Sequence, residues 1–173
     1  MPSHHDIRPE IILGEFRCRL DNRYRVPIPP DFDRWLTGNS PELVLAKERP
    51  GCLSLWNRAF WEAKVNAKIR LVQQKVQQGF QDERIGQVQL FGRLLSSRHQ
   101  DAKLDKQRRL TVPKSFRDFL GVKPRTGDAE DPEQSNVMVV GAAVCVEVWN
   151  PAAWLEHLRQ RMPKFRRLID RLF

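Results

Sequence analysis

Apolar and charged residues alternate in the segment from Leu13 to Leu20. The apolar set is Phe16, Cys18 and Leu20, and the charged set is Glu15, Arg17 and Arg19. A period of two predicts a β-strand with one buried face. Asp21 and Asn22 then have the chemistry of a turn. The segment from Tyr24 to Ile28 predicts a strand that returns along the first one.

A short helix and a second hairpin are predicted next. Pro29 and Pro30 end the strand, and proline is accepted in a first helical turn. Three apolar residues then follow at helical spacing: Phe32, Trp35 and Leu36. The segments Leu43 to Lys47 and Cys52 to Trp56 predict two strands, joined across a turn that contains Pro50 and Gly51.

Two longer helices should follow this hairpin. Asn57 is a suitable N-cap for the first of them. The positions after Asn57 carry apolar side chains at spacings of three and four: Trp61, Val65, Ile69, Val72 and Val76. Gly79 is expected to end this helix, and a second helix should begin near Asp82. Its apolar stripe is Ile85, Val88, Phe91 and Leu95.

The strand, turn, strand and helix pattern occurs twice in the chain. Residues 20–29 (LDNRYRVPIP) recur as residues 104–113 (LDKQRRLTVP), an offset of 84 positions. A second match, offset by 93 positions, relates residues 52–57 (CLSLWN) to residues 145–150 (CVEVWN). An internal repeat of this kind predicts two similar halves, so a surface function of one half should be presented twice.

The repeat suggests a division of the chain into four parts. We predict a first repeat at 12–68, a helical spacer at 69–97, a second repeat at 98–160 and a basic tail at 161–173. The nine-position difference between the two offsets is explained by an acidic insertion at 123–136. Its acidic residues are Asp128, Glu130, Asp131 and Glu133.

The tail has the pattern of an amphipathic helix interrupted at Pro163. From His157 onward, apolar residues recur at helical spacing among many arginines. We expect one face of this helix to be docked and the other to be basic. Two interpretations of the basic face stay open: a surface helix that only packs, or a phosphate contact that carries no sequence information.

Composition and charge indicate a folded protein with an anionic partner. The chain has 173 residues, of which 40% are hydrophobic and five are tryptophan, enough to form a core. Its net charge of +9 favours polyanions, nucleic acid first and an anionic membrane second. A merely basic protein without such a partner is the remaining alternative.

The cysteines indicate a reducing compartment. There are three, with no C-x-x-C pair, and Cys52 and Cys145 occupy the same position of the repeat, where a side chain should face the core. A disulfide framework is therefore not expected. No apolar stretch approaches the ~18 residues that a membrane span needs, and residues 1–6 have no signal-peptide core. We expect a cytoplasmic protein without a membrane partner.

Motifs of enzyme catalysis are missing from the sequence. It contains no glycine-rich phosphate loop, no H-E-x-x-H and no nucleophile elbow. The four histidines (His4, His5, His99 and His157) have no partner at metal-ligand spacing. We therefore expect no catalytic residues, no metal, no cofactor and no small-molecule substrate. Asp21 and Asp105 could form a nuclease pair, but a structural role in each repeat is favoured.

The repeated motif D-x-x-x-R carries the candidate chemistry, as Asp21 with Arg25 and as Asp105 with Arg109. The carboxylate can accept hydrogen bonds from N–H groups of the turn and so stiffen it. It can also orient the guanidinium, whose planar donors fit guanine or a phosphate. The alternative is a salt bridge that only holds the hairpin. Basic neighbours favour a nucleic-acid face: Arg17, Arg19, Arg23, Lys103, Lys106 and Arg108.

The chain resembles the MraZ family from about Leu13 to Leu158. The similarity rests on the two D-x-x-x-R motifs, each followed by a strand and a proline step, Ile28-Pro29 or Val112-Pro113. The Gly51-Cys52-Leu53 strand, the Val146–Trp149 strand and the helices headed by Trp61 and Trp154 match as well. The resemblance implies an α+β fold of tandem AbrB/MraZ-like repeats that forms a double-split (swapped-hairpin) β-barrel with peripheral helices.

The resemblance also implies a function. It indicates a cytoplasmic, nucleoid-associated homo-oligomer, arranged as a ring, that binds short direct repeats in double-stranded DNA upstream of division and cell-wall genes. Arg25 and Arg109 would contact the DNA. An AbrB-like antitoxin, or an interaction module without a role in gene regulation, is an alternative of another class, although such chains typically carry one hairpin repeat.

One departure from the family pattern concerns the turns. The family usually places glycine just before the arginine, whereas Tyr24 and Arg108 occupy these positions here. Glycine permits a positive φ, which tyrosine and arginine resist. Either the turn has a different shape in this protein, or it carries strain.

Overall fold

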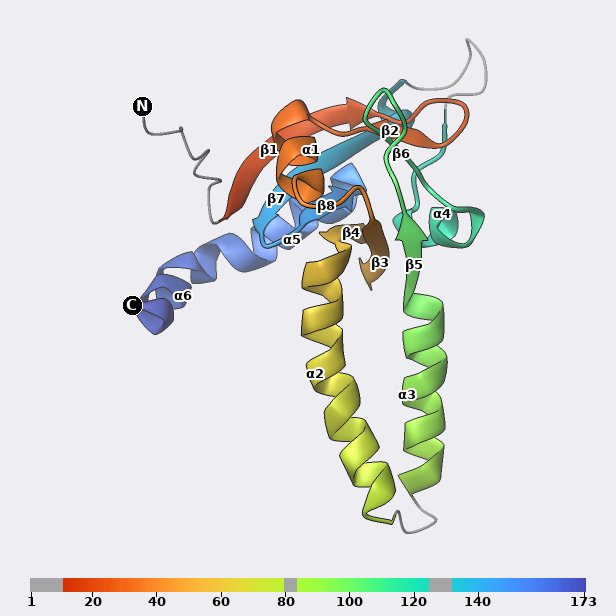
Figure 1. Ribbon diagram of the computed structural model, residues 1–173. Coiled ribbons are helices and arrows are strands. Elements are labelled where there is room, and N and C mark those ends of the chain that lie inside the picture. The colour runs from red at the N-terminus through yellow and green to blue at the C-terminus, as the bar shows by residue number, and fades with distance from the viewer. Residues whose placement is uncertain (1–10, 80–83, 125–131) are drawn as a thin grey trace, which may run out of the picture.

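The computed structural model describes residues 11–79, 84–124 and 132–173 (Figure 1). It contains a six-stranded antiparallel main sheet, ordered β1-β7-β8-β4-β3-β5, and a two-stranded ribbon of β2 and β6. The strands are β1 (Ile12–Arg19), β2 (Arg25–Pro27), β3 (Leu43–Arg49), β4 (Cys52–Asn57), β5 (His99–Ala102), β6 (Arg109–Thr111), β7 (Asn136–Ala143) and β8 (Val146–Trp149).

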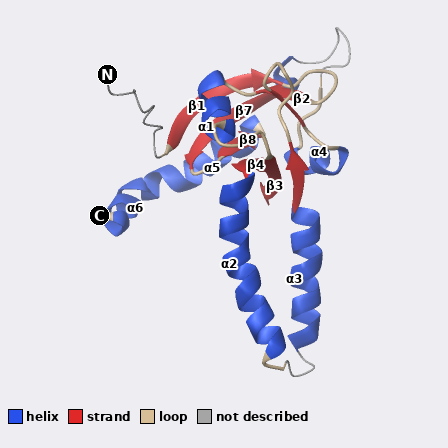
Figure 2. Cartoon of the chain, in the orientation of Figure 1, coloured by secondary structure: helices blue, strands red, loops and turns tan. Residues whose placement is uncertain are grey.

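Helices surround the main sheet and extend from it (Figure 2). They are α1 (Pro30–Thr37), α2 (Arg58–Gln77), α3 (Ile85–Arg98), α4 (Lys114–Leu120), α5 (Pro151–Arg161) and α6 (Phe165–Leu172), with 3₁₀ turns at Pro132–Ser135 and Met162–Lys164. The helices α2 and α3 project together away from the sheet, and α5 and α6 leave it in another direction (Figure 1). The fold is therefore mixed α+β.

The two repeats exchange strands with each other. β1 and β3 of the first repeat pair with β7 and β5 of the second. β4 pairs with β8 at the centre of the main sheet, with Cys52 opposite Trp149 and Leu55 opposite Val146. Among the described strands, the pairs that lie within one repeat are the hairpins β3–β4 and β7–β8. The main sheet is thus symmetric about its centre, and the repeats share one core.

A closed barrel is not found in the described part of the chain. The main sheet has two free edges, β1 and β5, and none of its strands pairs with the ribbon. The ribbon and the short helices α1 and α4 instead cover one face of an open sheet. The closed double-split barrel that the resemblance implies is therefore replaced by an open sheet and a separate ribbon.

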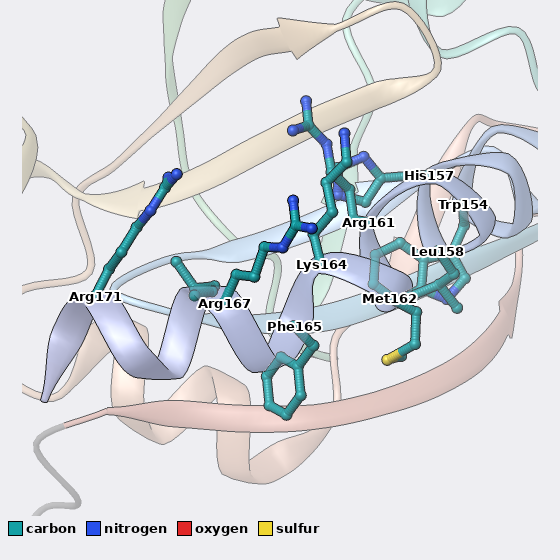
Figure 3. Close-up of a pocket in the computed structure, with 10 residues that line it drawn as sticks. Trp154, His157, Leu158, Arg161, Met162, Lys164, Phe165, Arg167 and Arg171 are labelled. Atoms are coloured by element: carbon teal, nitrogen blue, oxygen red, sulfur yellow. The ribbon is translucent and has the colours of Figure 1, made fainter.

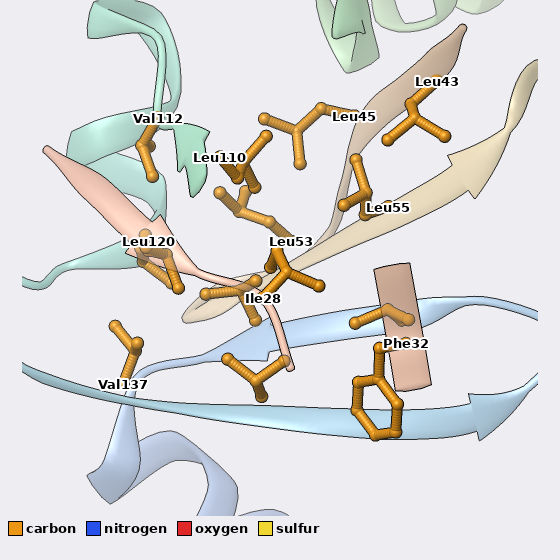
Figure 4. Packing of buried hydrophobic residues seen from close by; sticks show 14 of the residues in the cluster. Ile28, Phe32, Leu43, Leu45, Leu53, Leu55, Leu110, Val112, Leu120 and Val137 are labelled. Atoms are coloured by element: carbon orange, nitrogen blue, oxygen red, sulfur yellow. The ribbon is translucent and has the colours of Figure 1, made fainter. Parts of the chain in front are cut away.

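Alternation along the central strands creates the core (Figure 4). Leu53 and Leu55 of β4 and Val146 and Val148 of β8 point to one face, where they are fully buried with residues of the ribbon and the short helices. The residues that join them from those elements are Val26, Ile28, Phe32, Leu36, Leu110, Val112, Phe116 and Leu120. This cluster fastens the ribbon to the main sheet through its inner side.

The opposite face of the main sheet carries two tryptophan clusters. Cys145 packs with Trp56 and Trp61, whereas Cys52 packs with Trp149 and Trp154. Each cysteine therefore contacts the tryptophans of the other repeat. Both thiols are buried, as the sequence predicts, and neither is in a disulfide. Burial raises the pKa of Cys52, and it raises the pKa of Cys145 to about 12.

Local signals predict most of the elements correctly. Asn57 caps α2 through a hydrogen bond from the N–H of Ala59, and Asn150 caps α5 through the N–H of Ala152. Each asparagine also donates to the end of the preceding short helix, at the carbonyl of Leu36 or Gly121. The repeat thus extends to these caps. The predicted start of the second spacer helix near Asp82 lies outside the described residues, as does the middle of the acidic insertion, 125–131.

Two predictions about burial are wrong. Phe16 is 43% exposed rather than buried, because β1 is an edge strand and only part of one side of it is covered.

The tail is helical and interrupted by the 3₁₀ turn that contains Pro163, as expected. However, no residue of α6 is buried, and Phe165, Leu168 and Leu172 are more than half exposed. Its apolar face does not dock on the described part of the chain, because α6 extends past the edge of the sheet. None of the described helices is long and apolar enough to cross a membrane.

Candidate nucleic-acid interface

The first Asp–Arg turn, residues 21–25, is organised by the carboxylate of Asp21. One oxygen, Oδ1, accepts hydrogen bonds from the backbone N–H groups of Arg23 and Arg25, at 2.9 and 3.0 Å. The other, Oδ2, accepts from Nε of the Arg25 guanidinium at 2.7 Å. The turn is closed by the Tyr24 N–H, which donates to the Asp21 carbonyl at 3.0 Å. One side chain therefore fixes both the turn and the arginine.

The second Asp–Arg turn, residues 105–109, repeats this geometry. Oδ1 of Asp105 accepts from the N–H groups of Gln107 and Arg109, each at 2.9 Å. Oδ2 accepts from Nε of Arg109 at 2.8 Å. The Arg108 N–H donates to the Asp105 carbonyl at 2.9 Å. The role of aspartate as an orienter of arginine, predicted from the sequence, is present in both repeats.

The residue before each arginine has a left-handed backbone. Tyr24 and Arg108 both have φ of 58°. This conformation costs non-glycine residues roughly 1–2 kcal/mol, because Cβ approaches the following carbonyl. Of the two alternatives that the sequence leaves open, the structure therefore selects strain. The turns keep the positive φ that glycine would adopt, and the rest of each turn holds the larger residue in place.

Hydrogen bonding keeps both aspartates ionised. Desolvation opposes ionisation of Asp21, but bonds from the Arg25 and Arg23 N–H groups and from the Arg25 side chain outweigh it, so the pKa of Asp21 lies below its usual value. The pKa of Asp105 is lowered in the same way, against a desolvation cost, by Arg109 and Gln107. An ionised carboxylate is what the orientation of a guanidinium requires.

The ribbon brings the two turns to one surface. In its register Arg25 lies opposite Thr111, and Pro27 lies opposite Arg109. Side chains alternate between the faces of a strand, so these four residues share the outer face of the ribbon, and the α-carbons of the two arginines are roughly 7–8 Å apart as a diagonal pair. The alternate residues, Val26 and Leu110, point inward and are buried. The result is one surface with two oriented arginines.

Comparison with known proteins shows what this chain is similar to. The model of the family described as "MraZ protein, putative antitoxin-like" matches residues 97–172. A protein named "Transcriptional regulator MraZ" from Natranaerobius thermophilus is 23% identical over 162 residues, which cover 94% of this chain and 96% of that protein. The chain is thus similar to the MraZ family, in its second repeat and tail by the family model and over most of its length by these relatives.

Other proteins of the MraZ family match over a similar length. The "Transcriptional regulator MraZ" of Kocuria rhizophila is 27% identical over 155 residues, covering 90% of this chain and 92% of its own. That of Deinococcus radiodurans is 28% identical over 142 residues, covering 82% and 83%. These relatives extend over both repeats, whereas the family model matches the second repeat and the tail.

The remaining basic residues predicted for this surface lie on or beside the two turns. Arg23 is exposed on the first turn, and Lys106 and Arg108 are exposed on the second. Arg19 ends β1 and Lys103 follows β5, both exposed, at equivalent positions of the two repeats. Five of the seven predicted cations are thus on the turns, and two stand at the ends of the strands that lead into them.

Arg117 is a cation at this surface that sequence reasoning missed. It lies on α4, and its guanidinium is 3.8 Å from the centre of the Tyr24 ring. Its Nε donates to the Val112 carbonyl at 3.1 Å. Alignment of the two repeats could have drawn attention to it, because the charge changes at this position: Arg117 corresponds to Asp33 at the offset of 84 positions. The two repeats therefore differ in charge at a position next to the turn.

The alternative reading of Asp21 and Asp105 as a catalytic pair has little geometric support. Both oxygens of each carboxylate are engaged by the residue's own turn. Within the described ranges, no three histidine, cysteine or acidic side chains gather where they could hold a metal ion.

A groove of about 570 Å³ lies along α5 and α6, away from the turns (Figure 3). Its lining combines apolar residues such as Leu158, Phe165 and Leu168 with the basic side chains of Arg161 and Arg167. His157 at one end has a lowered pKa, because of desolvation first and the nearby charges of Arg49 and Arg161 next. This groove is separate from the Asp–Arg surface, since its lining residues belong to α5, α6 and the turn between them, and these helices lie apart from β2 and β6 (Figure 1).

Proposed function

We propose that this protein is a transcriptional regulator that binds double-stranded DNA in a sequence-specific way through the outer face of the ribbon. The observation that carries the proposal is the pair of arginines, Arg25 and Arg109, each held by its own aspartate on that face. The names of the relatives support regulation of transcription. The net charge of +9 supports a polyanionic partner.

The geometry suits recognition of bases in the major groove. That groove admits a two-stranded β-ribbon, and arginine donates to O6 and N7 of guanine. In both turns Nε is engaged by aspartate, so the terminal nitrogens of each guanidinium remain to form the fork. A guanidinium that is already oriented loses less side-chain entropy on binding. Arg25 and Arg109 are therefore assigned to base or phosphate recognition.

The neighbouring cations are assigned to the DNA backbone. Arg23, Lys106 and Arg108 are exposed on the turns, and Arg19 and Lys103 are exposed at the strand ends. Contacts of this kind fix orientation without reading sequence. Asp21 and Asp105 act as structural residues of the motif. Association with the nucleoid in the cytoplasm follows from this function.

Two further parts of the proposal rest on the family. The sites would be short direct repeats upstream of division and cell-wall genes, and the protein would act as a homo-oligomer, arranged as a ring. Exposed apolar residues on the tail and the helical spacer, such as Leu168 and Leu94, support association of copies. Linked ribbons would then bind repeated sites more tightly than one ribbon could.

An antitoxin-like interaction module is the second candidate, and the description of the family model favours it. Such a module would need a protein partner and no DNA sequence. The presence of two Asp–Arg turns on one ribbon favours the regulator. Two oriented arginines suit an anionic partner such as DNA, whereas a protein partner bound through an apolar segment would not need them.

The test is selection of bound DNA from a pool of random duplexes. The regulator should enrich short motifs that recur at regular spacing. The variant with Arg25→Ala and Arg109→Ala is the matched control and should enrich none. If the folded wild-type protein enriches no motif, the proposed function is wrong and the interaction module is preferred.

A further inference from the structure

The two Asp–Arg turns differ at the left-handed residue. In the second turn this residue is Arg108, whose exposed side chain adds a charge beside Arg109. In the first turn it is Tyr24, which is half-buried and packs against the core. Within the turns themselves, the second turn therefore has a cation at the left-handed position and the first turn has none there.

Arg117 supplies a cation at the corresponding place in the first turn. Its guanidinium lies 3.8 Å from the Tyr24 ring centre, a distance at which a cation is attracted to the face of an aromatic ring. Its Nε donates to the Val112 carbonyl at 3.1 Å. These two contacts fix the guanidinium, and no carboxylate in the described part of the chain pairs with it. The N–H groups of its terminal nitrogens are therefore available to donate hydrogen bonds to a ligand.

The position of Arg117 suggests what those donors bind. Arg25 lies on the outer face of the ribbon, and Tyr24 packs on the inner side against the core. A guanidinium stacked on Tyr24 is therefore at the flank of the ribbon. When the outer face lies in a groove of DNA, the flank is next to the phosphates that border the groove.

We infer that Arg117 is a further DNA-contacting residue, that it binds a backbone phosphate beside the first turn, and that Tyr24 is the positioning residue that holds it there. This inference rests on the proposed DNA binding. It makes the two turns equivalent in charge, because Arg108 serves the second turn and Arg117 serves the first. It also gives Tyr24 a role at a position where glycine would avoid strain.

The experiment measures DNA affinity against salt concentration for Arg117→Gln, with Arg70→Gln as the matched control. Arg70 is an exposed arginine on α2, within the helical pair that projects away from the ribbon. Loss of one phosphate contact should reduce the magnitude of the log–log salt slope by roughly 0.9. Arg117→Gln should show this reduction and weaken selected and random duplexes by the same factor, while Arg70→Gln should keep the wild-type slope.

A double-mutant cycle tests the role of Tyr24. Tyr24→Leu removes the stacking partner, so part of the Arg117 contribution should be lost in this variant. The effects of Tyr24→Leu and Arg117→Gln on affinity should then sum to more than the effect of the double variant. Independent effects would contradict the positioning role.

Folding is monitored by thermal unfolding and by the fraction of molecules active in binding. If Arg117→Gln does not fold, Arg117→Met, which keeps an aliphatic contact with the ring, is measured instead. A slope equal to that of Arg70→Gln, in a folded variant, overturns the inference and leaves Arg117 as a packing residue. Wild-type protein that prefers no sequence would instead overturn the proposed function, so the two failures are distinct.

Discussion

The backbone N–H of Ile28 donates to the carbonyl oxygen of Arg108 at 2.9 Å, across the boundary between the two repeats. The reciprocal bond joins the Val112 N–H to the Tyr24 carbonyl at 2.8 Å. The left-handed residue of each turn thus accepts from the strand that follows the other turn. The two turns form one structural unit, so a substitution in either turn should alter the structure of both.

Replacing the motif arginines should reduce specific binding without unfolding the protein. Arg25→Ala or Arg109→Ala should weaken binding to a selected duplex by ~1–3 kcal/mol, the usual value of a bidentate base contact. Each ion pair is partly exposed, so its contribution to stability should be small. Affinity and thermal unfolding are measured on the same samples. A variant that melts much earlier, yet binds normally per folded molecule, would assign these arginines to the hairpin alone.

Glycine at the left-handed positions should have opposite effects in the two turns. Arg108→Gly relieves the strain of φ at 58° with no loss of buried contacts, so stability should rise by about 1 kcal/mol. Tyr24→Gly relieves the same strain but removes a ring that packs against the core and Arg117, so stability should fall. Chemical denaturation measures both. Equal gains in both turns would show that the Tyr24 ring contributes nothing to folding.

Glu147 should destabilise the protein at neutral pH. Burial on β8 raises its pKa, and nearby Glu48 adds to this, while a hydrogen bond from Trp149 at 2.8 Å and the charge of Arg49 act in the opposite direction. A raised pKa in the folded state contributes stability that is present at low pH and lost as the pH rises through that pKa. Glu147→Gln keeps an acceptor for Trp149 and should raise the melting temperature at pH 7.

The pH dependence provides the control for this prediction. Near pH 4 the wild-type carboxyl is largely protonated, so Glu147→Gln should bring little gain there. The same change at Glu156, which is exposed on α5, should show no such dependence. A gain of equal size at both pH values would mean that ionisation of Glu147 is not its cause.

The tail should contribute to DNA affinity without contributing to specificity. The basic residues of α6 are all exposed. If Arg166 and Arg167 each neutralise a phosphate, replacing both with glutamine should lower the magnitude of the salt slope by roughly 0.9 per contact. Selected and random duplexes should weaken by similar factors. An unchanged slope in the folded variant would exclude a phosphate contact by these two arginines.

The protein should sediment as an oligomer. A monomer of 20.3 kDa would leave the apolar side chains of Phe165, Leu168 and Leu172 more than half exposed to water. Analytical ultracentrifugation at micromolar concentration should therefore show a species larger than one chain. A monomer that retains full specific binding would rule out oligomerisation as a requirement of function.

The sequence alone determines the local structure and the chemistry of the motif. Asp21 and Asp105 can bond to their own turns because all the partners lie within four residues, so the geometry follows from the chain itself. The same holds for the caps at Asn57 and Asn150 and for the alternation that buries one side of β4. Short-range interactions of this kind can be predicted from the order of the residues.

Only the tertiary structure decides what is far apart in the sequence. Pairing of β2 with β6 places Arg25 and Arg109 on one surface, and it depends on hydrogen bonds between residues about 84 positions apart. The contact of Arg117 with Tyr24, the free edges of the main sheet and the exposed face of α6 are also results of packing. A local pattern shows which face of an element is apolar, but which element covers that face is set by the arrangement of the whole chain.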